Sequence, residues 1–375
     1  MCHEEAWHIA CDMGRVKPMS DSLVPPAILK AHDLVFTHDG MPGYSRKRSG
    51  RGFSYLTPAG SLLRSAAERE RITALVIPPA YEAVWICQLP NGHLQATGLD
   101  QRGRKQYRYH PEWHLLSGDR KFDLLPDFAK ALPRIRRKVR TALSSETLDR
   151  ERIVAGIVAL LDSTGFRIGN HRYARENRSF GITSLLSRHL SEEDGEWVLR
   201  FKGKSGKEHE AQIRDAKIAA LIADLHELPG QRLFRHEDES GAWRDVGTAD
   251  VNAWLKETGG GDFTAKQFRT WKATLLCALE LGRRPPEESE AACKRAEVAA
   301  IRSTAEALNH TVATCRKYYI HPGILKAYRD GELHRVMQAK PPRLRRADES
   351  AKLRADERRV LSLIEKYPAR PRRRR

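Results

Sequence analysis

The sequence predicts an α+β protein in which a small, strand-rich N-terminal domain precedes a larger, mostly helical domain. Short β-prone runs separated by Pro and Gly turns occupy the region from residue 30 to residue 114. Beyond residue 115, apolar residues recur at three- and four-residue spacing, as amphipathic helices require. The length of 375 residues and the 40% hydrophobic content suffice for two cores. The expected domains are residues 30–114 and 115–339.

In the small domain, three short runs are β-prone, at residues 72–77, 83–88 and 93–96. Pro78-Pro79 separates the first two, and the Pro-Asn-Gly sequence at residues 90–92 separates the last two. Both sequences are strong turn signals. This region should therefore contain a small sheet.

The segments before these strands are less regular. Residues 37–55 are rich in Gly, Ser and basic side chains and predict an irregular basic arm. Residues 57–60 predict a turn, and residues 61–70 are compatible with a short helix. Nothing before Pro25 indicates structure, and Met13 and Met19 leave the start codon open. Residues 1–29 are expected to be an unstructured extension.

The large domain carries helical patterns at residues 124–143, 148–162, 216–228, 249–257, 266–281 and 287–308. An exception is the pair of alternating runs at residues 197–201 and 209–213. They flank a Gly-Lys-Ser-Gly-Lys sequence, which predicts a β-hairpin. From Lys340 onward, fourteen Lys and Arg stand against five Asp and Glu, so residues 340–375 are expected to form a basic tail with a possible short helix.

The charge balance indicates a polyanionic partner. Sixty-six Lys and Arg against 48 Asp and Glu give a net charge of +18 and a pI near 9.8. A field of this sign concentrates nucleic acid around the protein. The charge alone, however, also fits a basic protein with no such partner.

Cysteine usage and the absence of sorting signals indicate a cytoplasmic protein. The six cysteines are scattered without a CxxC pair, which favours reduced thiols over a disulfide framework. Cys2, His3, His8 and Cys11 lie close together, but their spacing matches no ordinary zinc module. There is no signal sequence and no run of about 18 apolar residues.

Four separated segments offer groups that can act on a phosphate. Arg167 lies in TGFRIGN at residues 164–170, and Lys204 lies at the tip of the predicted hairpin. Arg269 lies in KQFRT, which opens a predicted helix at Lys266. Tyr319 follows His310 by nine positions and is itself followed by Ile-His-Pro. Each residue taken alone can be explained as an ordinary surface or packing residue, but their joint occurrence in this order is distinctive.

This set resembles the type IB DNA topoisomerases, particularly their poxvirus-like and bacterial branch. The resemblance covers about residues 70 to 325 and includes the Arg, Lys, Arg, His and Tyr motifs. It implies the mostly helical catalytic fold that this family shares with tyrosine recombinases. It also implies relaxation of supercoiled duplex DNA by transient cleavage of one strand, through a 3′-phosphotyrosyl intermediate and a free 5′-hydroxyl. The implied catalytic residues are Arg167, Lys204, Arg269, His310 and Tyr319.

The chemistry of these side chains suits strand cleavage and rejoining. A tyrosine nucleophile conserves the energy of the phosphodiester bond, and its phenolate is a good leaving group on the return step. Two guanidiniums can clamp the non-bridging oxygens, with His310 as a further donor. Lys204 is the candidate general acid for the departing 5′ oxygen, and Arg167 is a candidate to assist this proton transfer.

No cofactor is expected. The sequence contains no evident carboxylate or His/Cys ligand set for a catalytic metal and no Walker-type phosphate loop. The electrostatic stabilisation therefore falls to Arg and Lys, and neither a metal nor a nucleotide cofactor is needed.

Residues 98–109 resemble the family's DNA-contacting segment. Arg104 and Lys105 are suited to phosphate contacts, Gln106 to an adenine edge, and Tyr107 and Tyr109 to bases or sugars. Lys266 is a further expected DNA contact. The two domains could close around duplex DNA as a monomeric clamp, which implies a nucleoid-associated protein. The alternative for the small domain is merely an exposed amphipathic strand.

Two other classes fit part of the pattern. Tyrosine recombinases usually place His three residues before the second Arg, whereas this chain has Lys266 before Arg269. A non-catalytic DNA-binding protein should have lost at least one of the five positions, and none is lost. Two departures from the family pattern are Asn309, where Gly is common, and Val312, where Pro is frequent.

The adjacent Tyr318 is a rival nucleophile. The nine-residue spacing from His310 and the following Ile-His-Pro favour Tyr319.

Overall fold

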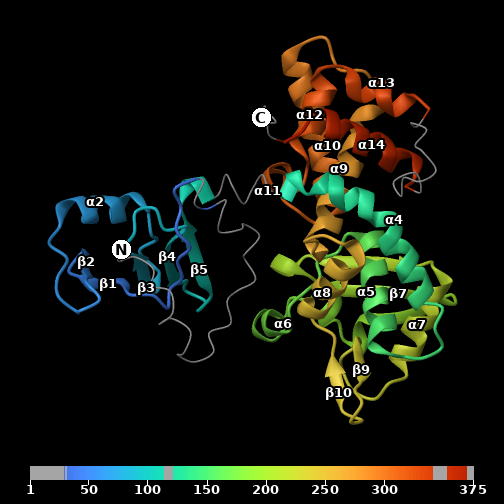
Figure 1. Cartoon of the computed structure of the whole chain (residues 1–375), viewed down its shortest axis with the longest axis horizontal. Coiled ribbons are helices and arrows are strands. Elements are labelled where there is room, and N and C mark those ends of the chain that lie inside the picture. The colour runs from blue at the N-terminus through green and yellow to red at the C-terminus, as the bar shows by residue number, and fades with distance from the viewer. Residues whose placement is uncertain (1–28, 30–31, 114–120, 341–352, 370–375) are drawn as a thin grey trace, which may run out of the picture. The chain divides into compact units, whose positions relative to one another are not determined.

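The computed structural model describes residues 29, 32–113, 121–340 and 353–369. The chain divides into two compact units, residues 1–120 and 121–375 (Figure 1). Its helices and small antiparallel sheets give the α+β class that the sequence predicts. The domain boundary expected at 114–115 adjoins a segment outside the described residues. The Cys2–Cys11 cluster and residues 1–28 also lie outside them.

The first unit is built on one antiparallel sheet with the strand order β2-β1-β3-β4-β5. Its strands are β1 (Gly43–Ser49), β2 (Gly52–Leu56), β3 (Glu82–Cys87), β4 (Leu94–Leu99) and β5 (Lys105–Tyr109). β4 is almost wholly buried, whereas β5 is paired on one side only and forms an edge. This edge strand carries four of the expected DNA contacts, Lys105, Gln106, Tyr107 and Tyr109.

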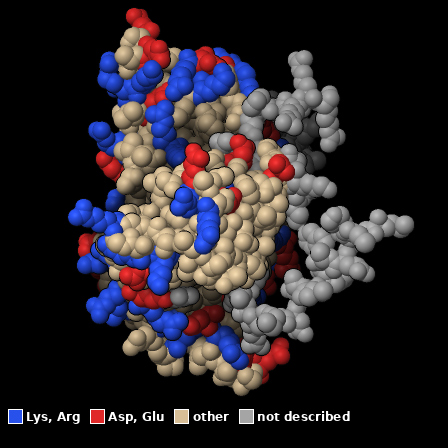
Figure 2. Space-filling model, turned by 90° about the vertical axis from the view of Figure 1, so that its left-hand side faces the viewer, with Lys and Arg blue, Asp and Glu red and all other residues tan. Residues whose placement is uncertain are grey.

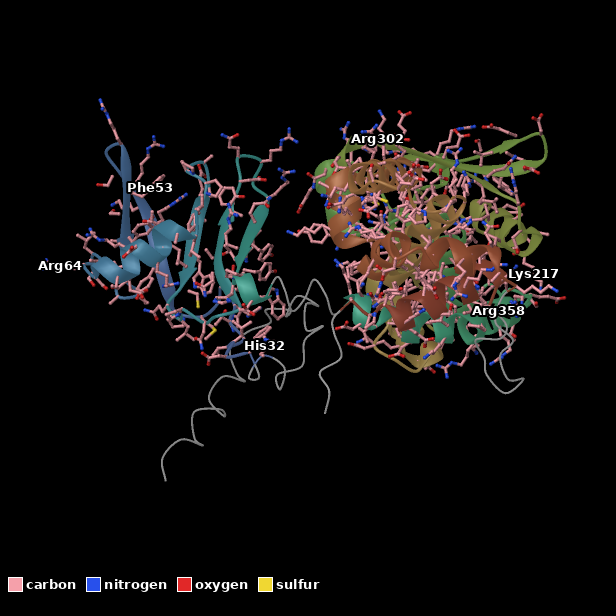
Figure 3. All side chains as sticks on the ribbon, turned by 90° about the horizontal axis from the view of Figure 1, so that it is seen from above. His32, Phe53, Arg64, Lys217, Arg302 and Arg358 are labelled. Carbon is pink, nitrogen blue, oxygen red and sulfur yellow. The ribbon has the colours of Figure 1, made fainter. Side chains whose placement is uncertain are left out.

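Helix α2 (Ala66–Ala74) packs on this sheet through a small apolar core. Ile72 is buried among residues that include Val84 and Ile86. Arg71 fixes the helix to the sheet, because its guanidinium donates to the Cys87 carbonyl and to Gln95 Oε1, both at 2.7 Å. On the β1–β2 hairpin, the Arg46 guanidinium lies 4.1 Å from the ring centroid of Phe53, which Figure 3 labels.

Two expectations for this unit are wrong. Residues 37–55 contain the β1–β2 hairpin rather than an irregular arm, because Tyr44, Phe53 and Tyr55 are half-buried while Lys47, Arg48 and Arg51 stay exposed. Residues 72–77 do not form a strand. Ile72 is buried as part of helix α2, and Val76 is exposed and has a positive φ of 47°. The predicted turn at residues 57–60 and the strands at 83–88 and 93–96 are confirmed.

The second unit is mostly helical. Its helices are α4 (Leu125–Ala142), α5 (Arg150–Thr164), α6 (His171–Asn177), α7 (Ala216–His226), α8 (Thr248–Gly259), α9 (Ala265–Gly282), α10 (Glu290–Ala307), α11 (Val312–Tyr318), α12 (Pro322–Arg329), α13 (Glu332–Gln338) and α14 (Ala355–Lys366). All six predicted helices are present. The almost fully buried α5 and α9 form the centre, where α9 packs against α5, α10, α13 and α14.

Small sheets complete this unit. The expected hairpin is formed by β7 (Glu196–Lys202) and β8 (Glu208–Ile213), and β6 (Leu190–Glu193) adds a third strand. A second hairpin pairs β9 (Arg235–Glu237) with β10 (Trp243–Asp245). The predicted β7–β8 hairpin therefore has a supporting strand that the sequence pattern did not indicate.

The segment expected to be a basic tail contains α14, which belongs to the helical core. Val360, Leu361, Leu363 and Ile364 are buried there. The buried carboxylate of Glu357 accepts two hydrogen bonds from Arg136 of α4, at 2.7 and 2.8 Å. This part of the chain is therefore a packed element rather than a solvated extension.

Figure 2 shows Lys and Arg interspersed with Asp and Glu, next to a broad uncharged area. Figure 3 labels basic side chains on both units, among them Arg64 and Lys217. Among the helices of the described residues, none combines the length and apolar character needed to cross a membrane.

Candidate active site

Arg167 lies in the loop that follows α5. The helix ends at Gly165, whose φ of 68° is a left-handed conformation that favours glycine. The carbonyls of Arg167 and Ile168 then accept hydrogen bonds from the amides of Ile182 and Thr183, at 3.0 and 2.7 Å. These bonds fix the loop, so the Arg167 side chain starts from a rigid backbone.

Arg269 lies on the buried face of α9 and is only 3% exposed. Its Nη1 donates to the Gly165 carbonyl at 2.5 Å, and its Nη2 donates to the Leu308 carbonyl. Burial and the nearby Arg167 lower the pKa of Arg269 to about 10, so it remains cationic at neutral pH. The guanidinium thus joins the end of α5 to the end of α10.

His310 lies between α10 and α11, next to both arginines. Its Nε2 accepts a hydrogen bond from Arg269 Nε at 2.8 Å, and its Nδ1 lies 3.3 Å from Arg167 Nη2. Burial is the largest cause that lowers the pKa of His310 to about 3, followed by the charges of Arg269 and Arg167. The imidazole is therefore neutral at physiological pH.

Both departures from the family pattern near His310 have local explanations. Asn309 has a φ of 52°, in the left-handed region that Gly and Asn tolerate best. Val312 is the first residue of α11, a position that also suits proline. Neither change alters the path of the backbone that the loop requires.

Tyr319 directly follows the short helix α11. Its ring faces the cluster formed by Arg167, Arg269 and His310. Its ring centroid lies 4.2 Å from that of His310, and the Arg269 guanidinium lies 5.7 Å from the ring centre. Burial lowers the pKa of both the Arg167 and the Arg269 guanidinium, and the neighbouring Tyr319 phenol partly offsets this lowering. The phenol therefore lies beside two cationic side chains.

Thr274 of α9 fixes the backbone at Tyr319. Its hydroxyl donates to the Tyr319 carbonyl at 3.2 Å and accepts from the His321 amide at 3.1 Å. Because α9 also carries Arg269, one helix positions both the Tyr319 backbone and a guanidinium. The sequence indicated no role for Thr274, since a buried Thr in a helix has no distinguishing motif.

Tyr318 lies outside the cluster. It is 40% exposed, and its ring contacts the ammonium groups of Lys121 and Lys317, at 4.8 and 5.4 Å from the ring centre. The structure thus separates the two adjacent tyrosines: Tyr319 meets the arginines and Tyr318 faces outward.

Lys204 lies in the turn between β7 and β8 and is exposed. It is close enough to His310 to contribute, after Lys207, to the lowering of the pKa of that residue. Lys204 is therefore at the edge of the cluster rather than inside it.

The positive charges of Arg167 and Arg269 make this cluster suitable for binding an anion. Arg167 Nη1 is buried and has no hydrogen-bond partner among the described residues. Since a neutral imidazole has one acceptor nitrogen and His310 Nε2 accepts the shorter bond, from Arg269, the ring proton is on Nδ1; Arg167 Nη2, 3.3 Å away, is also a donor and does not bond to it. A phosphate oxygen between them could accept from both. The arrangement is suited to stabilising negative charge that develops on a phosphoryl group.

A second basic feature lies beside the Arg167 loop. A cavity of about 770 Å³ is lined by five arginines and one carboxylate, namely Arg175, Arg178, Arg188, Arg232, Arg235 and Asp245. Asp245 is already paired with Arg232 at 3.2 Å. Arg235 has two buried nitrogens, Nε and Nη2, without partners among the described residues. This cavity is also suited to phosphate.

In the first unit, β5 separates the expected DNA contacts onto two faces. Tyr107 and Tyr109 share one face and stack at 6.1 Å, with Lys105 over the Tyr107 ring at 5.9 Å. Gln106 is on the other face, where its Nε2 donates to Asp100 at 2.9 Å. Arg104 pairs with the same carboxylate at 2.6 Å, and Lys105 pairs with Asp39.

Lys266 is exposed in the first turn of α9, three residues before Arg269. No group of three or more His, Cys, Asp or Glu side chains that could hold a metal ion occurs within the described ranges.

Comparisons with known proteins cover most of the chain. Residues 111–341 match the family model described as eukaryotic DNA topoisomerase I, catalytic core, and residues 52–100 match that of the bacterial DNA topoisomerase IB N-terminal domain. DNA topoisomerase 1B of Acanthamoeba polyphaga mimivirus is 33% identical over 298 residues, which are 77% of this chain and 88% of that protein. DNA topoisomerase I of monkeypox virus and DNA topoisomerase 1B of vaccinia virus (strain Copenhagen) are each 22% identical over 275 residues, 73% of this chain and 83% of theirs.

Proposed function

The chain belongs to the type IB DNA topoisomerases, isomerases that act on duplex DNA, and from this premise we propose that Tyr319 is the nucleophile that cleaves and reseals one strand. The observation that carries the proposal is the convergence of Arg167, Arg269 and His310 around the Tyr319 ring. The tyrosine recombinase alternative is not favoured by the family matches.

The first step is attack of the Tyr319 phenolate on the scissile phosphorus. The bond that forms is a 3′-phosphotyrosyl ester, and the bond that breaks is the one to the 5′ oxygen. Because one phosphoester replaces another, no energy from ATP is needed to reseal the strand. In the return step, the 5′-hydroxyl attacks the same phosphorus and the phenolate departs.

The pentavalent transition state is stabilised by fixed donors. Arg167 and Arg269 bind the non-bridging oxygens, and His310 donates its Nδ1 proton as a neutral group. The unpartnered Nη1 of Arg167 supports this assignment, since a buried guanidinium nitrogen without an acceptor is costly until an anion arrives. No step in this scheme requires a metal ion.

Lys204 is the proposed general acid. Its place on the exposed turn beside the cluster supports this role, since Lys204 is close enough to influence His310. It would give its proton to the leaving oxygen during cleavage and recover it when the strand is resealed.

The proposed DNA contacts extend over both units. Tyr107, Tyr109 and Lys105 offer a stacking and cationic face, and Gln106 and Arg104 would exchange their Asp100 contacts for DNA. Lys266 and the arginine-lined cavity are proposed to bind backbone phosphates. We propose that a single chain closes around the duplex and works at the nucleoid.

Relaxation of a supercoiled plasmid in the presence of a chelator and without ATP tests the proposal as a whole. We expect full activity, and DNA labelled at its cleaved 3′ end should be recovered on a peptide that contains Tyr319. An absolute requirement for Mg²⁺, or label on Tyr318, would contradict the scheme.

A further inference from the structure

A buried histidine outside the proposed catalytic set joins three of the segments that carry it. His209 of β8 is 5% exposed. It is surrounded by Phe166, the neighbour of Arg167; by Gly203, the neighbour of Lys204; and by Asn309, the neighbour of His310. Each contact is therefore one residue away from a proposed catalytic side chain.

The ring contacts of His209 are tight. Its centroid lies 5.1 Å from that of Phe201 in a stacked geometry and 4.9 Å from that of Phe166 in an edge geometry. Gly203 packs directly on the imidazole, because a Cβ built on Gly203 would come within 2.5 Å of His209 Cδ2. The backbone that precedes Lys204 thus packs against the His209 ring. Any larger residue at position 203 would push the backbone and the ring apart.

Asn309 completes the connection through hydrogen bonds. Its Nδ2 donates to the Glu208 carbonyl at 3.0 Å and lies 3.2 Å from His209 Nδ1. Burial, followed by the charges of Arg269 and Arg167, lowers the pKa of His209 to about 4, so the ring is neutral and Nδ1 can accept. One amide therefore ties the loop before His310 to the strand that follows the Lys204 turn.

We propose that Asn309 and His209 are positioning residues that hold the β7–β8 turn so that Lys204 reaches the leaving 5′ oxygen. This inference rests on the proposed role of Lys204 as general acid. Lys204 is exposed, and the Asn309 amide links the loop before His310 to Glu208 and His209, directly after the Lys204 turn. A glycine at position 309 would keep the backbone conformation but would lose this support.

The test compares two leaving groups in single-turnover cleavage. One substrate carries the ordinary 5′ oxygen, and the other carries a 5′ bridging sulfur, which leaves without an acid. We expect Asn309→Gly and His209→Phe to slow cleavage of the oxygen substrate about tenfold or more, a part of the effect of general acid catalysis. Both variants should cleave the sulfur substrate at a rate close to that of the unaltered protein.

Two comparisons make the test specific. In a Lys204→Ala background, Asn309→Gly should add no further loss, because the group that it positions is absent. Asn91→Gly is the matched control: it removes a similar amide bond, from Asn91 Nδ2 to the Asp33 carbonyl at 3.0 Å, in the other unit. It should leave both rates unchanged.

The outcomes separate this inference from the function on which it rests. Equal slowing on both substrates would mean that the pair supports the arginines or the fold instead, and no slowing would mean that the turn needs no such support; either result overturns the proposal. If sulfur fails to rescue Lys204→Ala itself, the acid assignment fails and the proposal falls with it, while strand cleavage by Tyr319 still stands.

Discussion

Arg269 donates its Nε–H to Nε2 of His310 over 2.8 Å, which leaves the single imidazole proton on Nδ1. The pKa of His310 is lowered to about 3, mainly by burial, so the ring is neutral at physiological pH and Nδ1–H can be offered to an anion. An amide side chain can supply the same kind of donor.

His310→Asn should therefore retain most of the cleavage rate, whereas His310→Ala should lose about a hundredfold, the typical effect of removing one transition-state donor. Single-turnover cleavage of a labelled duplex measures both. If the Asn and Ala variants were equally slow, the neutral-donor role would be wrong.

The two adjacent tyrosines should behave differently. Tyr319→Phe removes the phenol from the cluster and should abolish plasmid relaxation while DNA binding stays nearly intact. Tyr318→Phe changes an outward-facing ring and should remain active. Gel relaxation with a parallel binding measurement checks both. Loss of activity in the Tyr318 variant alone would reverse the assignment.

Lys204→Ala should slow cleavage of ordinary DNA by about a hundredfold or more, the usual scale of general acid catalysis. A substrate with a 5′ bridging sulfur should restore the rate, because a thiolate leaves without a proton. Lys202→Ala, an exposed neighbour on the same hairpin, is the control and should need no rescue. Failure of the sulfur substrate to restore the rate would assign the acid elsewhere.

The arginine-lined cavity should contribute to DNA affinity without sequence preference. Arg188→Gln should weaken binding and reduce the slope of log K against log salt by about 0.9, as expected for one lost phosphate contact. Arg283→Gln removes the same charge from an exposed site paired with Glu280, outside the cavity lining, and is the matched control. An identical effect of the two substitutions would indicate only the loss of net charge.

Stability should fall on mild acidification. Burial lowers the pKa values of His209, His310 and His321 to about 4, 3 and 4, whereas in the unfolded chain each returns to about 6.5. Between these values the unfolded chain binds more protons, so the free energy of unfolding decreases as the pH falls from about 6.5 to about 4. Urea unfolding at about pH 7 and about pH 5 checks this. His209→Phe should flatten the dependence, and an equal or higher midpoint at the lower pH would contradict it.

The sequence predicted those elements whose periodicity is set by one buried face. The helices at 124–143 and 266–281 and the hairpin around Lys204 have clear apolar spacing, and all three are present. The β1–β2 hairpin was missed because its alternating aromatics are diluted by basic residues. The packing of α14 was missed because a tail rich in Lys and Arg hides four buried aliphatic residues.

The candidate site was predicted through motifs, and its supporting contacts were not. The motifs name Arg167, Arg269, His310 and Tyr319, which the fold brings together. Thr274, His209 and Asn309 act through tertiary contacts that no local spacing reveals. Asn309 was visible only as a departure from a common Gly, and its positive φ explains why Asn can stand there.

Arg167 and His310 meet although they are 143 positions apart, and Glu357 reaches Arg136 across 221 positions. Contacts between residues this far apart in the chain slow folding, because the ends of a long segment must be brought together first. Since His310 and Tyr319 lie in the last fifth of the 375 residues, a chain truncated before residue 310 would carry β5 but not the complete cluster.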